Sequence, residues 1–356
     1  MSLIKTMSES ISSKNILEFT QSFESLGVLK SQYEDFIVIE NLGFFPSGDG
    51  EHIFVYLEKK GLNTEEVAKI LAKFASVSVK NVSFSGMKDK DALTQQWYSI
   101  HLPGKIELNW QAFDYENIKI LKVSRHHKKL KLGTHKSNSF EIILRQCDFD
   151  YEKLPVAVSK IRTGGVPNYY GAQRFGKENS NLIRLCDWLN GQIKPSFKAQ
   201  KWLLSVYRSF LFNQYLAYRI KENRLFCLLE GDVVKLNHSN SLFEVTSDEL
   251  QSLNQRYEFH DLMPTGPLWG RKNKLVLKNE AEILLEKSLE AFKLWLDHKI
   301  IDQFRLDMDF RSLVLFIDDF HADYNLNENH LKLKFSLPAG GFATAVIDYL
   351  SKLTKR

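Results

Sequence analysis

The sequence has little cysteine and no long apolar segment. Its three cysteines, Cys147, Cys186 and Cys227, are odd in number and far apart, so no pair has the spacing of a metal site or a redox motif. No apolar run is long enough to span a bilayer, and the first residues lack the apolar core of a signal peptide. These absences predict a reduced protein of the cytoplasm without a membrane partner.

A strong excess of charge is also missing. Lysine and arginine total 48 against 43 acidic residues, which gives a net charge of +5. This balance is not that of a histone-like protein, and it suits a polyanionic partner only if the positive charge is clustered. Gly340 and Gly341 precede a helical pattern, but the spacing of a P-loop or a dinucleotide-binding fingerprint is absent. The sequence therefore argues against the nucleotide-binding folds that depend on those loops.

The first 150 residues are rich in predicted strands. A chain of 356 residues exceeds the usual size of one compact core, so we expect two domains. Apolar residues at helical spacing predict a helix that begins at Asn63 or Thr64 and includes Phe74. Alternation of apolar and polar residues predicts strands at 35–40, 53–57, 82–84, 97–101, 118–123 and 140–144. This content is typical of an α+β sheet domain.

Helical patterns dominate the middle of the chain, at 180–191, 200–223 and 281–296. Strand patterns return at 313–317 and 330–335, before a loop and a terminal helix. We predict a sheet domain that carries an inserted, mainly helical domain; two consecutive domains with a short tail are the alternative. The predicted divisions are a partly flexible N-terminal segment at 1–29, a sheet domain at 30–160 and 313–356, and an inserted domain at 161–312.

The segment FSGMKDKDALTQQW, at 84–97, has more polar chemistry than a hairpin needs. Gly86 allows a sharp bend, and the ammonium groups of Lys88 and Lys90 favour the charged form of Asp89 between them. An ionised loop carboxylate can act as a nucleophile or a base. The side chains that follow, Thr94 and Gln95, could fix the loop or hydrogen-bond a polar edge of the substrate. A solvated, charge-neutral turn is the alternative.

A basic run, RHHKKLKLGTHK, occupies 125–136. If it forms a strand, Lys129 and Lys131 point to one face, which suits a phosphate backbone. Its histidines invite a metal, but no carboxylate or cysteine nearby completes a ligand set. Asn138 and Phe140 follow directly, and the ring could stack on a base drawn out of its helix. The alternative for the basic run is an inert, solvated segment, and the alternative for Phe140 is a core residue at the start of a strand.

A glycine-rich aromatic segment, VPNYYGAQRFG, occupies 166–176. It fits no regular element. It could form a tight loop that presents rings and the guanidinium of Arg174, or it could be a hinge between domains.

Several of these segments, in this order, resemble the tRNA pseudouridine synthase D (TruD) family. GMKDKDALTQQW is similar to the family's Gly-x-Lys-Asp-x-x-Ala-x-Thr-x-Gln motif, and NYYGAQRFG, RSFLFNQ, TGPLWG and LPAGGFATAV are similar to later family segments. The resemblance extends from about Lys30 to the C-terminal helix. It implies a pseudouridine synthase α+β domain with a mainly helical insertion. It also implies an isomerase that converts uridine 13 of tRNA to pseudouridine without a cofactor or metal.

The resemblance also implies roles for individual residues. Asp89 matches the catalytic aspartate, and Phe140 matches a ring that stacks on the target uracil. Asn138 matches a neighbouring asparagine, and Lys30 a lysine that pairs with the aspartate. The implied partner is tRNA. Nothing in the sequence demands a dimer or a protein partner, so we expect a monomer.

Two other functions fit parts of the sequence. The basic run and the surplus aromatic residues fit a non-catalytic RNA-binding protein or RNA chaperone on the same scaffold. Asp89 and Asp91 could serve a metal-dependent nuclease, although no further carboxylates are arranged to complete its site.

Overall fold

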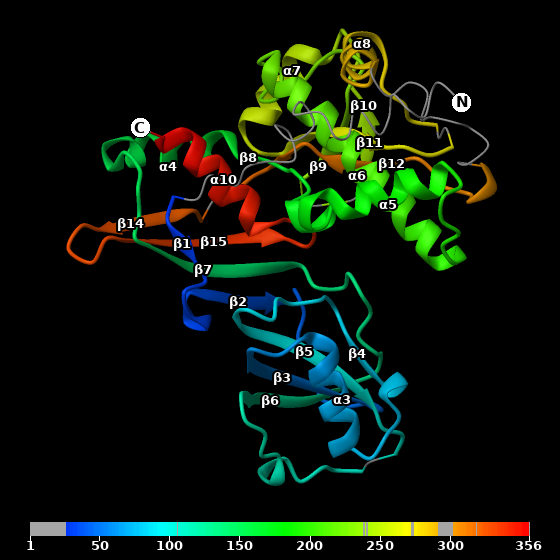
Figure 1. Ribbon diagram of the computed structural model, residues 1–356, viewed down its shortest axis with the longest axis vertical. Helices are drawn as coiled ribbons and strands as arrows, with labels where there is room; N and C mark the ends of the chain where they lie inside the picture. The colour runs from blue at the N-terminus through cyan, green and yellow to red at the C-terminus, as the bar shows by residue number, and fades with distance from the viewer. Residues whose placement is uncertain are drawn as a thin grey trace. The chain divides into compact units, whose positions relative to one another are not determined.

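A computed structural model describes residues 26–104, 106–237, 239, 241–271, 274–290, 302–317 and 319–355 (Figure 1). The chain folds as two compact units. Ser25–Val158, Ile317–Ala343 and Leu353–Arg356 form the sheet unit; Ser159–Phe316 and Thr344–Lys352 belong to the helical unit. The α+β class predicted from the sequence is confirmed. The N-terminal segment predicted to be partly flexible lies almost wholly outside the described residues. No helix in the described ranges is long and apolar enough to cross a membrane.

One nine-stranded sheet organises the sheet unit. Its order is β14-β15-β7-β2-β5-β3-β6, with β1 added beside β7 and β4 beside β5. The strands are β1 Val28–Leu29, β2 Phe36–Asn41, β3 His52–Lys60, β4 Val82–Phe84, β5 Leu93–His101, β6 Ile118–His126, β7 Ser137–Arg145, β14 His321–Asn325 and β15 His330–Pro338. All neighbours are antiparallel except β2 and β5. Because β15 pairs with β7 along nine residues, the C-terminal strands complete the sheet begun by the N-terminal part (Figure 1).

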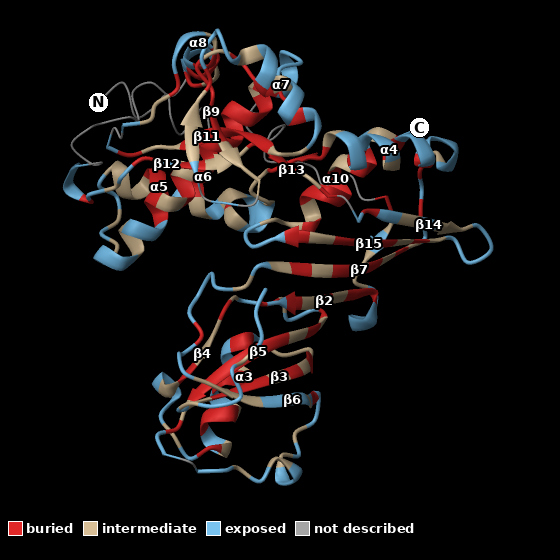
Figure 2. Cartoon of the chain, turned by 180° about the vertical axis from the view of Figure 1, so that it is seen from behind, coloured by how far each residue is buried: buried red, intermediate tan, exposed pale blue. Residues whose placement is uncertain are grey.

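The sheet follows the alternation of the sequence. Along β7, Asn138, Phe140, Ile142 and Leu144 are buried on one face while the residues between them are half-buried (Figure 2). Helix α3, Thr64–Phe74, begins with a capping box in which Asn63 and Glu66 bond each other's backbone. Its buried side chains join those of β3, β4 and β5 in one core. The helix is therefore fixed against the same face of β3 that carries the site described below.

The helical unit is built around α6, Phe197–Lys221, whose middle is buried on nearly all sides. The surrounding helices are α4 Leu154–Gly164, α5 Ser180–Leu189, α7 Leu250–Glu258, α8 Asn279–Ser288 and α10 Ala343–Thr354, of which α4 and α10 cross the unit boundary. A four-stranded sheet, order β10-β9-β11-β12, and a two-stranded sheet, β13-β8, complete the unit. Their strands are β8 Val166–Pro167, β9 Val233–Leu236, β10 Leu242–Glu244, β11 Leu262–Leu268, β12 Asp309–Ser312 and β13 Val314–Leu315.

The structure differs from the predicted elements in the helical unit. The four-stranded sheet was not predicted, because Pro264, Gly266 and Pro267 interrupt the strand pattern of β11. The strand predicted at 313–317 shortens to the two residues of β13. Helix α8 ends at Ser288, and part of its predicted extension lies outside the described residues.

Candidate active site

A row of register partners crosses the sheet on one face. Lys59 of β3 is paired with Thr94 of β5, and Thr94 with Val38 of β2. Val38 is paired with Phe140 of β7, and Phe140 with Phe335 of β15. Register partners project to the same side of a sheet, so five strands contribute to one surface.

The loop of Asp89 is fixed to this surface by its backbone. The buried ammonium of Lys59 donates to the carbonyl oxygens of Asp89 and Leu62, at 2.9 and 2.7 Å. The amide of Lys88 donates to Oγ1 of Thr64 at 2.9 Å. Burial lowers the pKa of Lys59 to about 8; the charge of Asp89 raises it and that of Lys88 lowers it further.

The carboxylate of Asp89 forms an ion pair with the ammonium of Lys30. Lys30 has a left-handed backbone with φ of 60°, and its Nζ lies 4.5 Å from the centre of the Phe36 ring. The Asp89 side chain is 33% exposed, so a substrate can reach it. Within the described residues Lys30 is thus the ion-pair partner of Asp89, whereas the sequence pattern placed Lys88 and Lys90 in that role.

Lys88 is directed into the interior. Its ammonium lies 2.9 Å from Oε2 of Glu40 and donates to Oδ1 of Asn138 at 2.6 Å. Glu40 also accepts hydrogen bonds from Oγ of Ser85 and the amide of Trp97. Both side chains of the ion pair are almost completely buried. This network fixes the orientation of Asn138 beside the Asp89 loop.

Phe140 is packed among other rings. Its centroid lies 5.3 Å from that of Phe335 in a stacked arrangement, and Phe36 meets it edge-on at 6.2 Å. Phe140 is 7% exposed and Phe36 is 4% exposed. Phe36, a further site residue that the sequence motifs did not indicate, contacts both Phe140 and the cation paired with Asp89.

The polar residues after the loop divide between the two faces of β5. Thr94 is buried on the site face, and its hydroxyl has no hydrogen-bond partner within the described residues. Gln95 lies on the opposite face, where its Nε2 donates to Glu58 at 2.9 Å. Gln96, which occupies the glutamine position of the motif, donates to the carbonyl of Gly86 at 3.3 Å. The structure therefore places Gln96 rather than Gln95 against the loop.

Lys129 and Lys131 are exposed on a loop between β6 and β7, not on the predicted strand. Leu130 between them is buried against Phe54 and Trp97. One buried leucine anchors the loop, and the two ammonium groups face solvent on either side of it.

Arg174 belongs to the helical unit, where it ends the short 3-10 helix Ala172–Arg174. Its guanidinium donates to Oγ of Ser205 at 2.7 Å and to Oγ of Ser209 at 3.1 Å. Burial lowers its pKa. The guanidinium is thus held by the helical unit's own side chains.

Two residues that organise the site, Glu40 and Lys59, could have been found from the sequence. Lys59 shares a strand face with Val55 and Leu57, and Glu40 shares one with Phe36. A charged residue at a core-facing strand position is costly unless it is paired, so such a position signals a buried polar network. For the metal alternative, no group of His, Cys, Asp or Glu that could hold an ion occurs within the described ranges.

Comparisons with known proteins identify the fold and the family. A crystal structure of a Methanosarcina mazei protein assigned to tRNA pseudouridine synthase D matches with a TM-score of 0.73 at 22% identity, and covers 96% of this chain and 98% of that one. The likeness shows that the sheet and the helical unit together form the fold of that class of RNA-modifying enzyme.

The sequence comparisons are more specific. The family model of tRNA pseudouridine synthase D (TruD) matches residues 16–189 and 195–349. A tRNA pseudouridine synthase D of Pectobacterium atrosepticum is 36% identical over 326 residues, which are 91% of this chain and 92% of that protein. The chain belongs to the TruD family. It is accordingly a tRNA pseudouridine synthase, an isomerase.

Proposed function

We propose that this enzyme isomerises uridine 13 of tRNA and that Asp89 is its catalytic carboxylate. The observation that carries the proposal is the Lys30–Asp89 ion pair. The Asp89 carboxylate is partly exposed, and the backbone carbonyl of Asp89 accepts a hydrogen bond from the buried ammonium of Lys59. The position in the tRNA rests on the resemblance of the whole motif set to the TruD family. A charged, preorganised carboxylate beside a lysine suits a reaction that needs a nucleophile or a base.

The reaction rearranges bonds without an external oxidant or group donor. The N1–C1′ bond breaks, the uracil turns, and a C5–C1′ bond forms; C5 loses a proton and N1 gains one. The carboxylate of Asp89 can add to the sugar or the base, or it can remove a sugar proton in a glycal route. In each route Lys30 holds the carboxylate in one orientation beside the substrate, so that it is positioned for the attack.

The target uridine must leave its stack to reach the carboxylate, which costs a few kcal/mol. We assign its binding to the surface next to Asp89 that carries Asn138 and the rings of Phe36 and Phe140. Stacking on a ring offsets about 1–3 kcal/mol of that cost. Asn138, oriented by Lys88, can hydrogen-bond the edge of the base. Because Phe140 and Phe36 are both nearly covered, a small displacement of the rings must open a face for the base to stack on.

We assign tRNA backbone contacts to the exposed lysines Lys129 and Lys131. We assign a further substrate contact to Arg174, whose guanidinium is oriented by Ser205 and Ser209. We also propose that the enzyme acts as a cytoplasmic monomer without a protein partner. Light scattering of the enzyme with and without tRNA tests the monomeric state, since a stable dimer would double the mass.

The test of the function is a pseudouridine assay on tRNA. The Asp89→Asn variant should form no pseudouridine yet bind tRNA nearly as wild type does. Asp91→Asn is the matched control, because Asp91 is an exposed carboxylate of the same loop and should retain full activity. Chemical labelling and mass spectrometry locate the product, and a tRNA with cytidine at position 13 should remain unmodified.

Each alternative has its own outcome in this assay. If Asp89→Asn retained wild-type turnover, Asp89 would not be the catalytic carboxylate. Binding of tRNA without any product would indicate the non-catalytic RNA-binding protein. RNA cleavage that EDTA abolishes would indicate the metal-dependent nuclease.

A further inference from the structure

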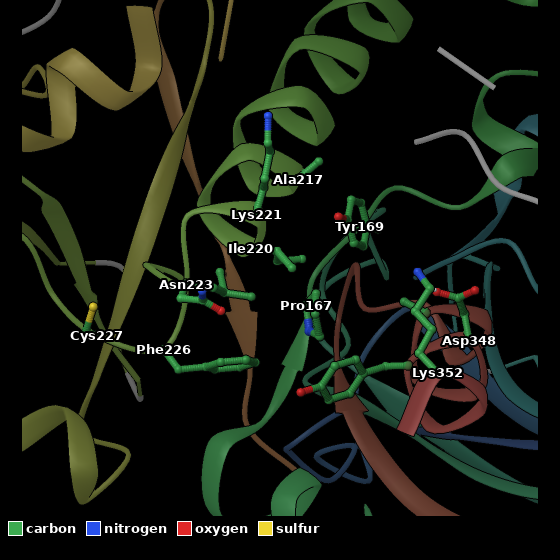
Figure 3. A pocket seen from close by; sticks show the side chains of 13 residues that line it. Pro167, Tyr169, Ala217, Ile220, Lys221, Asn223, Phe226, Cys227, Asp348 and Lys352 are labelled. Atoms are coloured by element: carbon green, nitrogen blue, oxygen red, sulfur yellow. The ribbon is translucent and has the colours of Figure 1, made fainter. Parts of the chain in front are cut away.

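A cavity that contains no residue of the Asp89 loop lies wholly within the helical unit (Figure 3). It has a volume of about 510 Å³ and is lined by the last turn of α6, the turn that follows it, β8 and α10. This volume is in the range of sites that hold a small molecule or one unit of a polymer. Its lining is mainly apolar, and the residues used below are Tyr169, Ile220, Lys221, Asn223, Phe226 and Tyr349.

Aromatic side chains form much of the wall. Phe226 is 41% exposed, and its ring centroid lies 6.3 Å from that of Tyr349 at a tilt of 44°. Ile220 is 37% exposed and also lines the cavity, between Phe226 and Tyr169 in the view of Figure 3. Two apolar side chains left so accessible beside a hollow form a surface that a flat, apolar ring can cover.

The polar groups of the cavity are of two kinds. Lys221, at the last position of α6, has no hydrogen-bond or ion-pair acceptor within the described part of the chain. Its ammonium lies 5.9 Å from the centre of the Tyr218 ring. The side-chain amide of Asn223 likewise makes no hydrogen bond to another described residue. Lys352 differs, because Asp348 already pairs with it at 2.9 Å. One unpaired cation and one unused amide therefore accompany the aromatic wall.

We infer that this cavity binds one unpaired nucleotide of the tRNA substrate, a nucleotide other than the target uridine. Its base stacks on Phe226, its edge meets the amide of Asn223, and its phosphate meets the ammonium of Lys221. Aromatic walls bind bases of any sequence, an amide can both donate to and accept from a base edge, and a lysine without a carboxylate partner suits a phosphate. An apolar peptide could cover the wall and hydrogen-bond the amide through its backbone, but it would bring no anionic group to the lysine. The inference rests on the proposed function only in that the ligand is tRNA.

Phe226→Ala is the central test, with Phe259→Ala as the matched control, because Phe259 is an 84% exposed phenylalanine of the same unit that does not line the cavity. We expect Phe226→Ala to weaken tRNA binding by about 5- to 150-fold, as loss of one stacked base does, and the control to bind as wild type does. Lys221→Gln should reduce the slope of log Kd against log salt by about 0.7, as loss of one phosphate contact does. Lys198→Gln is the control and should leave the slope unchanged, because Lys198 is an exposed lysine in the first turn of α6 that does not line the cavity. Circular dichroism melting verifies that each variant is folded.

Photo-crosslinking keeps the inference testable if truncation at 226 destabilises the unit. A photoreactive phenylalanine analogue at position 226 should crosslink to one nucleotide of bound tRNA, located by reverse transcription, and that nucleotide should not be uridine 13. Absence of a crosslink, together with wild-type affinity of the variants, would overturn the inference. Binding of free AMP or UMP that Phe226→Ala abolishes, with tRNA affinity unchanged, would also overturn it, because the cavity would then serve free nucleotides.

The outcome is separable from that of the proposed function. If wild type forms pseudouridine and the cavity variants bind tRNA normally, only the cavity assignment fails. If wild type binds tRNA through the cavity but forms no pseudouridine, only the proposed function fails.

Discussion

Lys30 and Asp89 form an ion pair across 59 positions of the sequence. Lys30 follows β1, which pairs with β7, while Asp89 lies between β4 and β5. The pair therefore exists only when the sheet is assembled. Lys30 has a left-handed backbone, which is less favoured for a residue with a side chain. This unfavourable conformation occurs at the residue whose ammonium pairs with the Asp89 carboxylate.

Removing this cation should lower turnover more than binding. In Lys30→Met the Asp89 carboxylate loses its ion-pair partner, and we expect kcat to fall by about 10²-fold while the KM for tRNA changes little. Lys30→Arg should recover part of the loss, because the charge returns with a different geometry. Steady-state pseudouridine formation measures both constants. Lys90→Met, which removes the exposed lysine on the other side of the loop, is the control and should keep wild-type kcat.

The buried lysine behind the loop gives a stability prediction with a defined sign. The folded-state pKa of Lys59, about 8, lies below the ordinary value of 10.5. Below pH 8 Lys59 is charged in the folded protein, so burial of the charge lowers the free energy of unfolding by its full amount. As the pH rises from 8 toward 10.5, Lys59 loses its proton in the folded protein and this cost disappears. Wild type should gain stability over this range, by an amount on the order of 3 kcal/mol, relative to Lys59→Met, which has no such charge.

Urea unfolding at pH 7.5, 8.5 and 9.5 should show about 2 kcal/mol of this gain, because the rest falls above pH 9.5. Other groups titrate equally in wild type and variant, so the difference between their slopes reports Lys59 alone. Lys60→Met is the control, because Lys60 is partly exposed and paired with Glu34. Identical pH slopes for wild type and Lys59→Met would show that the Lys59 ammonium is not held in a costly environment.

Much of the sheet unit could be predicted from the sequence, because its strands alternate cleanly and its turns carry glycine and proline. The helical unit was less predictable: the prolines of β11 pair with Val234 and Phe310 in a sheet that covers them, a tertiary context that no local pattern contains. In the site, the motif indicated the loop of Asp89. It could not indicate that Lys88 turns inward to Glu40, since that depends on which strand lies beside which.

The exposed lysines of the β6–β7 loop should contribute to RNA affinity. Replacing both Lys129 and Lys131 with alanine removes two charges that have no ion-pair partner within the described ranges. If each meets a phosphate, the slope of log Kd against log salt should fall by about 1.4 to 1.8. Lys332→Ala with Lys334→Ala is a matched double control, because Glu141 already pairs with both lysines. An unchanged slope in the Lys129 and Lys131 variant would show that the loop is only solvated.

A buried ion pair holds the end of α6 in the helical unit. The guanidinium of Arg219 lies 2.7 Å from the carboxylate of Asp232, and both side chains are fully buried. Arg219 also donates to the carbonyl of Arg224 at 2.8 Å, and Asp232 accepts from the amide of Leu229. Arg219→Met should lower the free energy of unfolding by about 3–5 kcal/mol, because the charge of Asp232 is left buried and unpaired.

Replacing both partners tests this reasoning. Arg219→Met combined with Asp232→Leu should recover much of the lost stability, since no unpaired charge remains, although the amide of Leu229 then lacks its acceptor. Urea unfolding of both single variants and the double variant gives the coupling energy as a double-mutant cycle. A double variant whose loss equals the sum of the two single losses would show that the residues act independently. Arg219 immediately precedes Ile220 and Lys221, so the same variants should also weaken tRNA binding if the cavity holds a nucleotide.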